Sequence, residues 1–211
     1  MRSKEVENYK LTLKLNPRQK EILVGVLLGD GHLERLYTPT LARLKIEHSL
    51  KQKDYVHWLY QEFKNWVRSE PKIKQVKIFG KIYFNYGFCT HGHRLLGNFH
   101  TKFYKNKIKI VPCDISDLLT PLNLAVWFMD DGSIKSNRHK GIFLNTQSFS
   151  TEDVERLQKA LKEKFFIEST TRRDKNGKQI YLGGINGEKL IRLIRPHIIS
   201  SMFYKIPKVL I

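Results

Sequence analysis

The chain has 211 residues, of which 41% are hydrophobic and 11% aromatic, so it is long and apolar enough to form a core without disulfide staples. Its 38 lysines and arginines outnumber 20 acidic residues and give a formal net charge of +18, which favours a polyanionic partner such as nucleic acid. Two cysteines exclude a disulfide framework, and the apolar stretch at 22–28 is too short to cross a membrane.

The first fifteen residues mix lysines with Glu5 and Glu7 and lack an apolar segment, so they predict neither a secretory signal nor a transit peptide. No Pro-, Gly- or Ser-rich linker follows them. We therefore expect a soluble intracellular protein, either in a prokaryotic cytoplasm or encoded and made inside a mitochondrion or chloroplast.

The first predicted helix begins at Asn16-Pro17, a typical N-cap pair, and ends at Asp30-Gly31, where glycine stops it. The segment between is apolar on nearly every side, so we expect it to be buried. A strand at 41–47, a helix at 51–67, strands at 72–78 and 81–88, and a helix at about 93–103 follow. The helix at 51–67 should face the core with Tyr55, Trp58, Leu59, Phe63, Trp66 and Val67.

The same order of elements recurs in the second half of the chain. Thr120-Pro121 opens an apolar helix that ends at Asp131-Gly132, 101 residues after the first Asp-Gly pair. The later elements are a strand at 141–145, a helix at 150–165, strands at 167–172 and 179–182 around a turn at 175–178, and a helix at 187–193. This pattern predicts an α+β fold of two pseudo-symmetric αββαββα halves, residues 1–112 and 113–211.

Both apolar helices carry small residues, Gly25, Gly29 and Ala125, that would let their backbones approach closely. Packed against each other at a shared centre, the helices place the carboxylates of Asp30 and Asp131 side by side at their C-termini. The helix dipole and the like charge both disfavour such a pair, and a bound cation would relieve both.

The two apolar helices carry a recognisable motif. Leu23–Gly31 and Leu124–Gly132 resemble the two copies of the LAGLIDADG motif, which names a family of homing endonucleases. The second copy, with Asn145–Phe149 and Met202–Pro207, is similar to the single-chain, intron-encoded branch. The resemblance spans roughly residues 18–207. It implies two saddle-shaped antiparallel sheets astride the DNA major groove, with the motif helices packed at the centre.

The resemblance also implies a metal site. In the family the last acidic residue of each motif holds divalent metal between the scissile phosphates, and the matching residues here are Asp30 and Asp131. Hard oxygen ligands suit Mg²⁺ or Mn²⁺, which can activate water and stabilise the phosphate. Asp130 does not match the ligand position, since its first-copy counterpart is Gly29, and we interpret it as accessory or structural.

Four further residues are candidates for the chemistry. Lys109 and Lys205 lie at similar spacings beyond the two motifs and match family lysines that orient water and stabilise negative charge. Gln147 matches a family position that orients solvent, and in the aligned first-half triplet His48 takes its place. An imidazole can exchange a proton at neutral pH, although a contact of His48 with the DNA backbone is an open alternative.

The strands supply the candidates for DNA contact, because a two-stranded ribbon fits the major groove and turns every second side chain to the bases. Any one of these side chains can instead contact a phosphate. Cys89 and the histidines after it lack the usual spacing of zinc ligands, which disfavours a zinc site. The candidates are Arg43, Lys45, Lys72, Lys74, Lys77, Lys81, Tyr83, Asn85, Arg172, Arg173, Lys175, Lys178 and Tyr181.

The predicted function is metal-dependent cleavage of both strands of double-stranded DNA at a long, non-palindromic site. One chain carries both acids, so we expect a monomer. Two alternatives stay open: an RNA maturase that assists splicing of its host intron on the same scaffold, and a nuclease-dead DNA-binding regulator. Both motif acids and both lysines are present, which favours cleavage.

Overall fold

The structure is a computed structural model that describes residues 4–38, 40–175 and 177–210. Two compact units make up the chain: residues 1–20 with 30–102, and residues 21–29 with 103–211. The first motif helix, α2 (Pro17–Leu28), therefore contributes most of its length to the second unit. Asn176, in the predicted turn at 175–178, lies outside the described residues.

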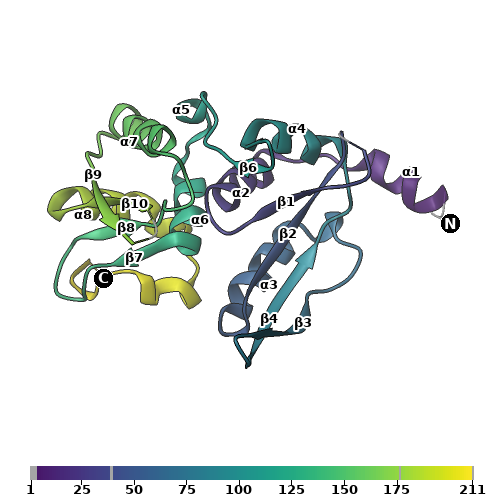
Figure 1. The fold of residues 1–211 in the computed structure, drawn as a ribbon, viewed down its shortest axis with the longest axis horizontal. Coiled ribbons are helices and arrows are strands. Elements are labelled where there is room, and N and C mark those ends of the chain that lie inside the picture. The colour runs from purple at the N-terminus through teal and green to yellow at the C-terminus, as the bar shows by residue number, and fades with distance from the viewer. Residues whose placement is uncertain (1–3, 39, 176, 211) are drawn as a thin grey trace. The chain divides into compact units, whose positions relative to one another are not determined.

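The sheet of the first unit has four antiparallel strands, in the order β1 (His32–Arg35), β2 (Ala42–Ser49), β4 (Lys81–Cys89) and β3 (Lys72–Ile78). Helix α3 (Lys53–Glu62) packs against β2, whose side chains alternate between buried and partly exposed (Figure 1). The predicted core face is confirmed for Tyr55, Leu59, Phe63 and Trp66, which are buried, whereas Trp58 and Val67 are only half-buried. The helix predicted at 51–67 is shorter, because 3₁₀ turns η1 (Leu50–Gln52) and η2 (Lys64–Trp66) flank α3.

The sheet of the second unit repeats this topology, in the order β7 (Gly132–Ile134), β8 (Ile142–Leu144), β10 (Gly177–Leu182) and β9 (Thr170–Asp174). Helices α7 (Thr151–Phe165) and α8 (Gly184–Ile194) follow β8 and β10. The strand predicted at 167–172 begins three residues later than expected. Phe166 ends α7 in the left-handed region, and Ile167 donates back to the Leu161 carbonyl, so Ile167 caps the helix instead.

The predicted contact between the motif helices is confirmed within the second unit, where the α2 residues 21–28 pack against α6 (Pro121–Asp131). A Cβ atom added at Gly25 would lie 2.6 Å from the Val126 Cβ and 2.7 Å from the Asn123 carbonyl oxygen, so only glycine permits this approach. Helix α6 is buried from Leu122 to Asp130, and Thr120 caps its N-terminus in a capping box. The αββαββα order predicted for each half is thus confirmed.

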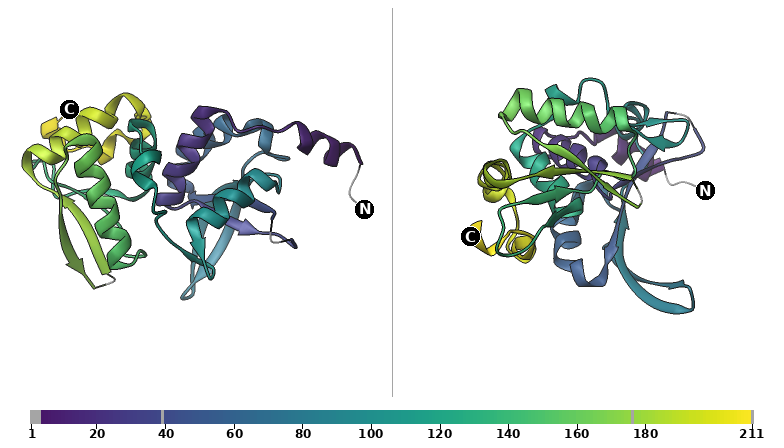
Figure 2. Two further views of the ribbon diagram at one scale, coloured as in Figure 1. Left: turned by 90° about the horizontal axis from the view of Figure 1, so that it is seen from above. Right: turned by 60° about the vertical axis from the view of Figure 1, so that its left-hand side comes forward.

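Helices α1 (Lys4–Thr12) and α5 (Ile115–Leu118) were not predicted. Helix α1 precedes the first motif and is joined to α2 by an extended segment (Figure 2). Helix α1 is mostly polar, so it lacks the apolar periodicity that predicts a helix. The Tyr9 hydroxyl donates a hydrogen bond to the Asn65 carbonyl. No helix in the described ranges is long and apolar enough to cross a membrane. The remaining elements are α4 (Arg94–Phe103), β5 (Tyr104–Lys105), β6 (Ile108–Lys109), α5 (Ile115–Leu118), η3 (Arg195–His197), η4 (Ser200–Lys205) and η5 (Lys208–Leu210).

Candidate functional site

Each candidate acid stands at or just after the end of a motif helix. Asp131 is the last residue of α6 and is half-buried, and Asp30 follows α2 by two residues with a side chain 53% exposed. Gly29, the residue before Asp30, packs so closely against the Asp130 side chain that no Cβ fits there. The Asp130 carboxylate is buried at this contact.

Two lysines cap the C-terminal ends of the motif helices. The Lys109 ammonium donates a hydrogen bond to the Gly29 carbonyl at 2.7 Å, and the Lys205 ammonium donates to the carbonyls of Met129 and Asp130 at 2.5 and 2.7 Å. Gly29 and Asp130 each immediately precede a motif acid, so the two lysines occupy equivalent places. They satisfy carbonyls that the helix leaves unpaired and set a positive charge at its negative end.

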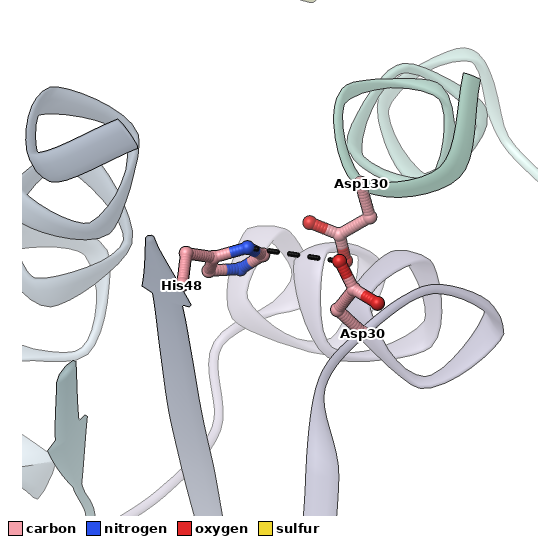
Figure 3. A group of neighbouring side chains, drawn as sticks. All are labelled: Asp30, His48 and Asp130. Atoms are coloured by element: carbon pink, nitrogen blue, oxygen red, sulfur yellow. Dashed lines mark ion pairs between the residues drawn. The ribbon is translucent and has the colours of Figure 1, made fainter. Parts of the chain in front are cut away.

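His48 lies against Asp30 in the first unit. Its side chain is only 3% exposed, and its Nδ1 atom lies 3.7 Å from the Asp30 Oδ2 atom (Figure 3). The Tyr55 ring packs edge-on against the imidazole, with 5.3 Å between the ring centroids. This packing holds the imidazole in one orientation toward the carboxylate.

The strand register of the two halves, which in β8 ends at Leu144, does not carry through to Gln147 in the turn that follows. His32 pairs with Lys45, and Ser133 pairs with Phe143. Since His32 and Ser133 each stand two residues after a motif acid, the register aligns Lys45 with Phe143, and counting on from there brings Thr146 level with His48. A shift of one residue exchanges the two faces of a strand. Similarity between the triplets that contain His48 and Gln147 therefore does not fix which residues are equivalent.

The residues around this position differ between the halves. Thr146 is fully buried and donates to the Lys178 carbonyl, whereas the Gln147 amide donates to the Asp174 carboxylate at 3.4 Å. In the second unit, therefore, no imidazole stands where His48 stands in the first. Instead the backbone N–H of Asn145 donates to the Asp131 carbonyl at 3.1 Å.

Most first-half DNA candidates share the sheet face away from α3, and one does not. The register places Lys77 opposite Ile82, on the other face of the β3–β4 hairpin from Lys74. Lys77 therefore does not belong with the other candidates. It lies three residues after Lys74, and side chains an odd number of residues apart on a strand point to opposite faces. The candidates on the shared face are Arg43, Lys45, Lys72, Lys74, Lys81, Tyr83 and Asn85.

Glu47 sits among these basic residues and was missed by the sequence analysis. Its carboxylate accepts hydrogen bonds from Lys74 at 2.9 Å and Asn85 at 3.1 Å, and the Lys45 ammonium lies 3.6 Å away. The hydrogen bond from Lys74 is the main cause that lowers the pKa of the Glu47 carboxyl, so this group is an anion on a basic face. Strand alternation from Arg43 and Lys45 could have identified it.

The second unit presents a different set of side chains. Arg172 stacks over the Tyr181 ring, with 5.2 Å from its guanidinium carbon to the ring centroid, and Gln179 donates to the Asn145 side-chain oxygen at 2.7 Å. By register Asn145 is the counterpart of Glu47, and neither amide was identified from the sequence. Two predicted candidates, Arg173 and Lys178, pair with each other on the opposite sheet face, whereas Lys175 is exposed beside the turn.

The donor chemistry fits a hard divalent cation. Asp30 and Asp131 offer carboxylate oxygens that remain at least partly exposed at helix ends. Carboxylate oxygen with phosphate and water completing the shell is the ligand set that Mg²⁺ and Mn²⁺ take.

Comparisons with known proteins agree on one family. Residues 20–190 match the model of the LAGLIDADG DNA endonuclease family. A probable intron-encoded endonuclease 1 of Wickerhamomyces canadensis is 31% identical over 97% of this chain and 90% of its own length. The cytochrome b mRNA maturase bI2 of Saccharomyces cerevisiae is 30% identical over 91% of this chain, which spans 48% of that maturase. The solved structure of the homing endonuclease I-WcaI bound to its DNA recognition sequence superposes with a TM-score of 0.90 and 30% identity, covering 96% of this chain and 92% of that one.

Proposed function

The chain belongs to the LAGLIDADG DNA endonuclease family, and from this membership and its site we propose that it is a site-specific endonuclease that hydrolyses both strands of DNA. The observation that carries the proposal is the duplicated helix end: each motif helix stops at an acid whose preceding carbonyl accepts a lysine. Both motif acids and both lysines are present, which favours cleavage over binding alone.

The two halves of the chain read different sequences in this proposal. Residues 1–112 contact one half of the target with a carboxylate, lysines and Asn85, and residues 113–211 contact the other with amides, Arg172 and Tyr181. Because these side chains differ in chemistry, the target is long and non-palindromic. One chain supplies both halves, so the active species is a monomer.

Asp30 and Asp131 would hold the divalent ion, for which we propose Mg²⁺ with Mn²⁺ as a substitute. When bound, the ion supplies an activated water and stabilises the charge that develops on the phosphate. Lys109 and Lys205 add positive charge beside the acids and fix the helix ends. His48, held against Asp30 by Tyr55, and Gln147 orient solvent in their respective halves.

A randomised DNA library tests the function directly. The protein is incubated with Mg²⁺ and a library of long duplexes, and the cut molecules are sequenced. We expect one long asymmetric site, with cleavage lost when EDTA removes the metal. Binding without cleavage across Mg²⁺, Mn²⁺ and Co²⁺ would contradict the proposal and favour a regulator or a maturase.

Replacing Lys205 by methionine tests the role of the helix-end lysines. We expect the single-turnover cleavage rate to fall roughly a hundredfold, because a positive charge beside the reacting phosphate is lost. Stability should fall by about 1 kcal/mol, since two helix-end carbonyls lose their donor. Lys208→Met, an exposed neighbour in the same C-terminal segment, is the matched control. Equal cleavage rates for the two variants would reduce Lys205 to a structural cap.

A maturase activity is the second candidate, favoured by the similarity to a cytochrome b mRNA maturase over most of this chain. The two functions separate cleanly, because splicing needs RNA contacts rather than the motif acids. We expect no acceleration of intron splicing by the wild type if the protein is an endonuclease alone. Splicing that depends on the protein and persists in Asp30→Asn and Asp131→Asn variants would establish the second activity.

A further inference from the structure

A pocket of about 500 Å³ lies in the first unit where α1 meets the end of the sheet. Its polar lining includes Glu7 and Lys10 of α1, Arg43 of β2, and Arg68, Ser69 and His91 of two loops, four separate parts of the chain. Neither α1 nor either loop has a role in the sequence motifs described above. The function proposed above uses only Arg43 among these residues.

The lining carries more positive than negative charge. Lys10 is only 15% exposed and pairs with Glu7 at 2.8 Å, and Arg43 pairs with Glu34 at 2.7 Å. Arg68, in contrast, is exposed and has no ion-pair partner among the described residues. Burial lowers the pKa of His91, and the nearby charges of Lys10 and Arg68 lower it further, while the Glu7 carboxylate acts in the opposite direction.

The pocket opens beside the face of the sheet that carries the DNA candidates. Cys89, another lining residue, pairs with Lys45, and Arg43 stands two residues before Lys45 on the same face. Arg43 pairs with Glu34 of β1. Glu34 stands four residues after Asp30, which corresponds to roughly 13 Å of extended chain at 3.3 Å per residue. An anion bound here would therefore lie along the sheet from the motif acid, not at it.

We propose that this pocket binds a backbone phosphate in the flank of the first half-site, which makes α1 part of the DNA interface. The inference rests on the proposed function. Lys10, Arg68 and the Ser69 hydroxyl are the donors, and Glu7 opposes binding by pairing with Lys10. A phosphate contact adds affinity for DNA without distinguishing one base from another. It therefore extends the length of DNA that the protein contacts beyond the bases recognised by the strands.

The experiment measures DNA affinity against salt concentration, with EDTA present to prevent cleavage. Lys10→Gln and Arg68→Gln should each weaken binding by up to about tenfold at low salt and reduce the steepness of log K against log salt by about 0.9, the value for one phosphate contact. The loss should be equal for every base substitution in the target. Glu7→Gln should have the opposite sign and tighten binding.

Lys4→Gln is the matched control, because Lys4 is on the same helix, is exposed and does not line the pocket. A target with an uncharged methylphosphonate at the flanking phosphate should bind the wild type no better than Lys10→Gln binds the natural target. Thermal unfolding midpoints check that the variants are folded. If the Lys10 and Arg68 variants match Lys4→Gln while the wild type still cleaves, the phosphate site is overturned and the proposed function stands. A wild type that binds no DNA at all would overturn both.

Discussion

Asp131→Asn should abolish DNA cleavage while leaving DNA binding within a few fold of the wild type. Asparagine has nearly the shape of aspartate but no charge, so it cannot hold a divalent ion of this type firmly. Loss of metal-dependent stabilisation of the phosphate is worth several kcal/mol, which corresponds to about a thousandfold or more in rate. Single-turnover cleavage of the target and equilibrium binding in EDTA measure the two quantities separately. Asp30→Asn should behave alike.

Asp131→Asn should also make the protein more stable, whereas a variant that lost activity through misfolding would be less stable. Asp131 is the last residue of α6, where a negative charge faces the negative end of the helix dipole. Removing the charge should raise the free energy of unfolding by about 0.3–1 kcal/mol without metal. Asp117→Asn, which removes an exposed acid from the first turn of α5, is the matched control and should leave cleavage unchanged. Wild-type cleavage by either motif variant would disprove the metal role.

Local signals in the sequence were enough to predict most of the fold. Proline after an N-cap residue marked the start of α6, and the Asp-Gly pair marked its end. The repeated order of elements then paired the halves without any knowledge of contacts. The end of α7 shows the limit, since a buried Ile167 reads equally as a strand residue or as the apolar partner of a helix cap.

The site was predicted less completely, because its contacts join residues far apart in the chain. Lys205 was found by its spacing, but only the structure shows that its ammonium reaches the carbonyls of residues 129 and 130. The partnership of Glu47 with Lys74 depends on strand register, which similarity between short triplets does not fix. For the same reason, the short triplets alone could not decide whether His48 corresponds to Gln147 or to Thr146.

Gly25→Ala should destabilise the protein by about 2–3 kcal/mol, although alanine in a helix interior normally stabilises by up to about 1 kcal/mol. The reversed sign follows from the contact of α2 with α6, where the new methyl would meet Val126 and a backbone carbonyl at 2.6–2.7 Å. For a chain of this length the thermal midpoint should fall by roughly 4–12 °C. Differential scanning calorimetry of the two proteins gives this change directly.

This substitution also tests whether helix spacing sets the geometry of catalysis. Gly25 lies five residues before Asp30 on the same motif, so a helix pushed outward by the methyl would displace the acid. A misplacement of about 1 Å can cost on the order of a hundredfold in rate, and we expect cleavage to fall even at temperatures where the variant is fully folded. Combining Gly25→Ala with Val126→Gly should recover part of the loss, giving a favourable coupling of about 1 kcal/mol in a double-mutant cycle. A Gly25→Ala variant that is more stable than the wild type and cleaves normally would mean that the two motif helices do not pack at this position. The close approach of α2 and α6 would then not depend on glycine at residue 25.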